Sequence, residues 1–155
     1  MTTRNSRRCG TSSATSRCDG FLLDTDIVSE FHKRSRADAG VLSWLAENQT
    51  EDFWLSVLVV GELRRGVELV RRRDDMSAVL LAARLDSVVA DYGDRILPVT
   101  SGICEQCARI TVPDPLPVVD GLVAATAIEH DLVLVTRNVA GVGRAPVRVV
   151  NPFAA

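Results

Sequence analysis

The 155-residue sequence is poor in the features that several classes of protein depend on. No apolar run reaches the roughly 18–20 residues that a membrane-spanning helix needs, so we expect no membrane span. No glycine-rich loop follows a predicted strand, which argues against a nucleotide-binding domain. The two histidines form no Ser–His or Cys–His pattern that would indicate a side-chain nucleophile. Aromatic residues make up only 5% of the chain, which leaves few for a base-stacking surface.

Cysteine is also scarce, and its four residues form two distant pairs, Cys9 with Cys18 and Cys104 with Cys107. No secretory leader places the chain in an oxidising compartment, so we do not expect a disulfide framework. The spacing of Cys104 and Cys107 also occurs in zinc and redox sites. Zinc needs two more ligands, and the other cysteines lie far away near the N-terminus, so buried or half-buried thiols are the prediction here.

Charge is unevenly distributed along the chain. Residues 1–18 contain four arginines and no acid. The whole sequence has a net charge of −2, so the net charge of residues 19–155 is −6. An acidic body argues against holding nucleic acid by bulk charge alone. Residues 1–20 lack the apolar stretch of a signal peptide and are predicted to be a disordered basic tail, followed by one domain over residues 21–155. A chain without leader or span is expected in the cytoplasm.

From Phe21 onward, short apolar runs alternate with stretches of helical periodicity. The expected strands are residues 21–24, 53–56, 95–99 and 132–136, with residues 147–150 as an edge strand. Apolar spacing predicts helices around residues 24–31, 41–45, 57–70, 81–92, 101–110 and 119–130. Asp24 or Thr25 is the expected N-cap of the first of these helices, and Ser56 is the expected N-cap of the third. Strands that alternate with helices predict an α/β fold in which helices cover both faces of a mainly parallel sheet.

Polar residues stand at the ends of predicted strands or in the helices that follow them, close to where open α/β sheets bind ligands. They are Asp24, Glu62, Asp120 and the turn formed by Thr136 and Asn138. Taken singly, Asp24 and Asp120 are ordinary helix N-caps, and Asn138 is an ordinary turn residue. With twenty acids in the chain, spacing alone is weak support for a site.

Glu62 fits a purely solvated surface less well than the other acids. On a helical wheel it lies at the border of the apolar stripe of its helix, beside Val59 and Gly66. That position is consistent with lining a cleft and, nearly equally, with a solvated face. Carboxylates brought together repel one another unless a cation neutralises them, and clusters of oxygen ligands suit Mg²⁺ or Mn²⁺.

Four segments occur together and in order: LLDTDIVSEF, LSVLVVGELRRGVEL, LPVVDGLVAATAIEHDLVLVTRNV and VRVVNPF. They resemble the PIN-domain toxins of the VapC type, in the FitB-like branch, over roughly residues 21–153. The resemblance implies a three-layer α/β/α PIN-like domain and a Mg²⁺-dependent endoribonuclease for which Mn²⁺ is a substitute. It further implies a homodimer with RNA as substrate and a VapB-like antitoxin that blocks the active site.

Carried onto this sequence, the resemblance makes Asp24, Glu62 and Asp120 the catalytic and metal-binding acids. Thr136 and Asn138 fall in the family's polar turn, where they would give polar support. The implied reaction is hydrolysis of an RNA phosphodiester by water that a carboxylate-bound Mg²⁺ orients and acidifies.

Arginines cluster on the helix predicted after the second strand. Arg64, Arg65 and the run Arg71–Arg73 lie largely off its apolar stripe, and Arg34 and Arg36 stand earlier in the chain. Contacts with RNA phosphates, salt bridges to an antitoxin and a solvated helix face explain them about equally well.

The turn after the fourth strand departs from the family pattern. The family has a TRN-x-x-D-F stretch, whereas this sequence has Gly141 and Val142 at the last two positions. One missing charge predicts weak metal binding, with Asp26 as the candidate to compensate. Gly141→Asp should then lower the metal requirement, unless a positive φ at that glycine opposes it. The alternative function is a catalytically weak PIN-fold module that binds RNA or an antitoxin without cutting.

Overall fold

The computed structural model describes residues 20–31, 33, 36–49 and 52–154. The predicted basic tail, apart from Gly20, lies outside these residues, as do Cys9, Cys18 and His32. The boundary at residue 20 therefore stays a prediction.

A parallel sheet forms the centre of the fold, with five strands in the described part of the chain, in the order β3–β2–β1–β4–β5. The strands are β1 (Phe21–Leu23), β2 (Phe53–Ser56), β3 (Ile96–Leu97), β4 (Val133–Val135) and β5 (Val149–Val150). Every pairing is parallel, and β5 is at one edge. The predicted strands and their parallel arrangement are therefore confirmed; β2 has the predicted bounds, and the other four strands are shorter than the apolar runs that indicated them.

Helices connect the strands. They are α1 (Thr25–Phe31), α2 (Ala39–Glu47), α3 (Val57–Arg71), α4 (Asp75–Tyr92), α5 (Ser101–Ile110), α6 (Val118–Glu129) and α7 (Val139–Val142). Short 3-10 turns follow at Gly93–Arg95 and Pro152–Ala154. The predicted cap at Ser56 is present, because its hydroxyl accepts a hydrogen bond from the Leu58 N–H at 3.2 Å. Helix α7 was not predicted, because four residues are too few to show a periodicity.

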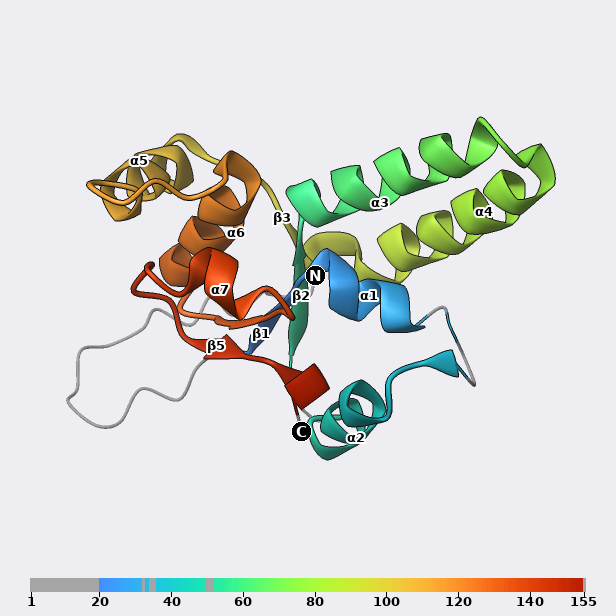
Figure 1. The fold of residues 1–155 in the computed structure, drawn as a ribbon, viewed down its shortest axis with the longest axis horizontal. Coiled ribbons are helices and arrows are strands. Elements are labelled where there is room, and N and C mark those ends of the chain that lie inside the picture. Colours follow the sequence, from blue (N-terminus) through green and yellow to red (C-terminus); the bar gives the residue numbers. More distant parts are fainter. Residues whose placement is uncertain (1–19, 32, 34–35, 50–51, 155) are drawn as a thin grey trace, which may run out of the picture.

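Two apolar layers, one on each face of the sheet, make up the core. Successive strand residues point to opposite faces, so Leu22 packs with α6 and the adjoining loops while Leu23 packs with α1, α2 and α3. Figure 1 shows α5, α6 and α7 on one side of β1 and β2, and α1 to α4 on the other. The predicted three-layer α/β/α architecture is confirmed.

Helices α3 and α4 form an antiparallel hairpin that extends away from the sheet (Figure 1). It has a small core of its own, in which Val67, Ala78 and Leu85 are buried. The buried residues of this cluster belong to neither of the two apolar layers of the sheet. Contacts between its own two helices therefore help to stabilise the hairpin.

Two expectations about individual side chains, Asp120 and Cys104, need correction. Asp120 is not an N-cap, because α6 begins two residues earlier at Val118, directly after Pro117, whose fixed φ suits a helix start. Cys104 is exposed, whereas Cys107 is half-buried as predicted. Trp44 and Phe53 are half-buried and pack against the core, and their ring centroids lie 5.8 Å apart.

The search for membrane spans covered the described helices. None of them combines the length and the apolar character that crossing a bilayer requires.

Candidate active site

The ends of β1 and β4 bring together two polar residues that are 112 positions apart in the sequence. Leu23 pairs with Val135 in the sheet, so the residues that follow them, Asp24 and Thr136, are neighbours at its carboxyl edge. The buried Thr136 hydroxyl donates to Oδ2 of Asp24 at 2.5 Å. The other carboxylate oxygen accepts from the Thr25 N–H at 2.8 Å, where α1 begins. Both oxygens of Asp24 are therefore fixed by hydrogen bonds.

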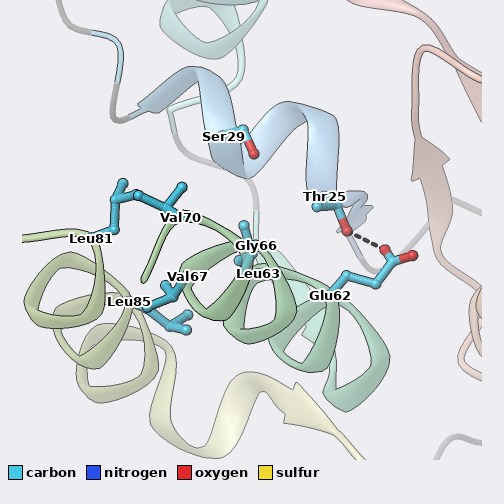
Figure 2. A pocket seen from close by; sticks show the side chains of 9 residues that line it. All are labelled: Thr25, Ser29, Glu62, Leu63, Gly66, Val67, Val70, Leu81 and Leu85. Carbon is cyan, nitrogen blue, oxygen red and sulfur yellow. Dashed lines mark hydrogen bonds between the residues drawn. The ribbon is translucent and has the colours of Figure 1, made fainter. Parts of the chain in front are cut away.

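Thr25 connects this strand end to α3. Its hydroxyl donates to Oε2 of Glu62 at 2.5 Å (Figure 2). Glu62 is exposed on α3 and its side chain points toward the start of α1. The first and second predicted acids are thus joined through one threonine.

Asn138 connects the same strand end to α6. Its Nδ2 donates to Oδ2 of Asp120 at 3.0 Å, and its backbone N–H donates to the Thr136 hydroxyl oxygen at 3.0 Å. Since Thr136 donates to Asp24, a continuous chain of hydrogen bonds runs from Glu62 through Asp24 to Asp120. The three acids predicted from the sequence therefore belong to one network.

Burial and mutual repulsion act on two of these acids. Burial raises the pKa of the Asp24 carboxyl, and the nearby charges of Asp26 and Glu62 raise it further, whereas its hydrogen bonds with Thr136 and Thr25 oppose the rise. Burial also raises the pKa of Asp120, and so does the charge of Asp24. The site thus holds carboxylates in an environment that disfavours their negative charge, and a cation would relieve that cost.

The donor set fits a hydrated divalent cation. Within the described residues, no three His, Cys, Asp or Glu side chains are grouped closely enough to hold one metal ion. A closed cage made of protein ligands alone is therefore not present in this arrangement. Mg²⁺ commonly keeps several of its waters and binds through one or two carboxylates, which matches the electrostatically coupled pair Asp24 and Asp120.

A cavity of about 290 Å³ opens beside Glu62, between α1 and the hairpin. Figure 2 shows Thr25 and Glu62 at one end of it and apolar hairpin side chains such as Leu81 at the other. Gly66 lines the cavity, and an added Cβ there would meet no described atom within 4 Å. This confirms that Glu62 borders a cleft, which was one of the two interpretations of its position on the helix.

The remaining predicted residues are placed less centrally. Asp26 is exposed on α1 and contributes repulsion to Asp24. Thr25 was considered in the sequence only as a helix cap, and its link to Glu62 was missed. A threonine directly after a strand-end aspartate was the available signal, but its partner lies 37 residues away.

Comparisons with known proteins find relatives of this chain. Residues 21–140 match the PIN domain family. Toxin FitB of Neisseria gonorrhoeae is 34% identical over 139 residues, which cover 86% of this chain and 98% of that protein. The VapC ribonuclease Y4jK of Sinorhizobium fredii is 28% identical over 142 residues, which cover 86% of this chain and 97% of that protein.

A solved structure extends the similarity to the fold. The crystal structure of FitAcB from Neisseria gonorrhoeae superimposes with a TM-score of 0.78 at 33% identity, over 87% of this chain and 99% of that chain. The whole described domain is therefore matched, including the strand ends and helices that carry the acids. This chain belongs to the PIN-domain family, among its toxins of the VapC and FitB type.

Proposed function

We propose that the protein is a metal-dependent endoribonuclease that acts as the toxin of a toxin–antitoxin pair. The observation that carries the proposal is the hydrogen-bonded network that links Glu62, Asp24 and Asp120 at the carboxyl edge of the sheet. Membership of the family that includes a VapC ribonuclease supports RNA as the substrate.

In this proposal Asp24 and Asp120 hold Mg²⁺ or Mn²⁺, and Glu62 completes the acidic site from α3. The cation, when bound, would neutralise charge on the scissile phosphate and lower the pKa of the attacking water. Glu62 is exposed beside the cleft and hydrogen-bonded to Thr25, so it is placed to accept a proton from that water. Thr136 and Asn138 orient the carboxylates of Asp24 and Asp120.

The proposed partners are a VapB-like antitoxin and a second copy of the chain. The antitoxin follows from the similarity to Toxin FitB, which covers nearly all of that relative. The homodimer is part of the proposal because the family resemblance of the sequence implies it. Both remain to be tested by purifying the chain with and without a co-expressed antitoxin and measuring the mass of each complex.

The decisive experiment measures cleavage of defined RNAs in Mg²⁺, in Mn²⁺ and in EDTA. Cleavage should require the metal, and Asp24→Asn should reduce its rate by roughly 100-fold or more without unfolding the protein. Asp86→Asn is a matched control, because Asp86 is an exposed aspartate paired with Arg64 on the hairpin. Full cleavage by Asp24→Asn, prepared in the same way, would overturn the assignment of the site.

Gly141 supports one alternative, a PIN-fold module that binds RNA or an antitoxin without cutting. This position is where the family commonly has a further acid. RNA binding without any metal-dependent cleavage would favour that alternative over the ribonuclease.

A further inference from the structure

Gly141 lies against the side chain of Asn138. A Cβ added at Gly141 would be 2.2 Å from Nδ2 of Asn138 and 2.7 Å from its Cγ and Oδ1, which is closer than such atoms approach in proteins. Backbone conformation is not the reason for the glycine, because the positive φ angles among the described glycines belong to Gly20 and Gly93. A positive φ at Gly141 would have opposed a side chain there, and that expectation is wrong. What limits a side chain at residue 141 is the space that the Asn138 amide occupies.

In this position the Asn138 amide connects α7 to the acidic network. Its Oδ1 accepts from the Gly141 N–H at 3.0 Å and caps α7, while its Nδ2 donates to Asp120. Both contacts come from the one short side chain that would have to move, so making room for a side chain at residue 141 disturbs both.

We propose that Gly141 is a positioning residue that acts through Asn138, and this inference rests on the proposed ribonuclease function. The missing side chain at 141 leaves room for the neutral Asn138 amide to reach Asp120 from the turn after β4. At this position the turn supplies Asp120 with a hydrogen-bond donor and adds no negative charge of its own. An aspartate at 141 would therefore displace Asn138 rather than simply add a ligand, contrary to the expectation from the sequence.

A double-mutant cycle of Gly141→Ala and Asn138→Ala tests this inference. At matched folded fraction and saturating Mg²⁺, each single variant should lower kcat for RNA cleavage by roughly 10- to 100-fold, with KM little changed. The double variant should lose no more than either single variant, because alanine at 141 acts only by displacing Asn138. Gly61→Ala is the control, since a Cβ at this glycine in α3 meets no described atom within 4 Å.

Melting temperatures supply a readout that does not depend on cleavage. Without metal, both single variants should melt about 2–4 °C below wild type, and the double variant should melt no lower. The rise in melting temperature caused by Mg²⁺ should be smaller in all three variants than in wild type.

Two results would overturn the inference: losses that multiply in the double variant, or a Gly141→Ala protein that matches wild type while Asn138→Ala is impaired. Failure of the proposed function looks different, because wild type itself would then cut no RNA. In that case the cycle is decided from melting temperatures alone. Additive decreases overturn the positioning role, and equal, non-additive decreases support it.

Discussion

The carboxyl edge of the sheet and the α3–α4 hairpin place their polar and apolar groups in opposite ways. At the sheet edge, acids gather where burial and repulsion raise the pKa values of Asp24 and Asp120. On the hairpin, charges stay outside in exposed ion pairs such as Arg64–Asp86, and Val67, Ala78 and Leu85 are buried between the helices. The hairpin is thus arranged for stability, and the sheet edge keeps an unfavourable concentration of charge that a reaction can use.

The largest change in the free energy of unfolding is expected from a substitution in the hairpin core. Leu85 is 3% exposed, so Leu85→Ala removes buried methyl groups and leaves a cavity, which should lower the free energy of unfolding by about 2–5 kcal/mol. Leu80→Ala, on the same helix but 58% exposed, should change it by less than about 0.5 kcal/mol. Urea unfolding of both variants checks the difference. Equal effects would mean that the hairpin is not stabilised by its own core.

The sheet edge should respond in the opposite direction. Asp24→Asn removes a buried charge that its neighbours repel, while an amide can still make hydrogen bonds to Thr25 and Thr136. Without metal at pH 7, we expect the melting temperature to rise by about 2–4 °C, which corresponds to about 1 kcal/mol. Asp26→Asn, an exposed change two residues away, should have little effect. A destabilised Asp24→Asn protein would contradict the electrostatic cost assigned to this position.

The pH dependence sharpens the same comparison. The folded-state pKa of Asp24 lies above the ordinary value of 3.8, so protonation at this site stabilises the folded protein fully below that value. This stabilisation is lost as the pH rises through the folded-state pKa. The melting temperature advantage of Asp24→Asn over wild type should therefore be largest at pH 7 and should shrink toward pH 4. If the melting-temperature advantage of Asp24→Asn grew as the pH fell, the pKa of Asp24 would be lowered, and not raised, in the folded protein.

The smallest effect is expected from the surface of the hairpin. Arg64 and Asp86 lie 2.7 Å apart, with side chains 44% and 66% exposed. A double-mutant cycle with alanine at each position should give a coupling energy of about 0.5 kcal/mol or less, falling toward zero in high salt. A coupling of several kcal/mol would show that the hairpin depends on its charges as well as on its core.

Much of the fold was predictable because it follows from local patterns. Alternating strand and helix periodicities gave the parallel α/β architecture, and the Ser56 cap was confirmed. Boundaries were less certain: α6 begins at Val118, because the preceding proline favours a helix start there. The short helix α7 depends on a side-chain cap from Asn138 and has no sequence period to reveal it.

By itself, the sequence determined which residues stand at strand ends and helix starts, since burial and capping depend on near neighbours along the chain. It therefore identified Asp24, Asp120, Thr136 and Asn138 as candidates, and the apolar periodicity of its helix identified Glu62. Only the tertiary structure decided how they connect, because the hydrogen bonds from Thr25 to Glu62 and from Thr136 to Asp24 span 37 and 112 residues. It also decided the meaning of Gly141, because whether a side chain fits at that position depends on where the Asn138 amide lies once Asp120 has been brought beside it.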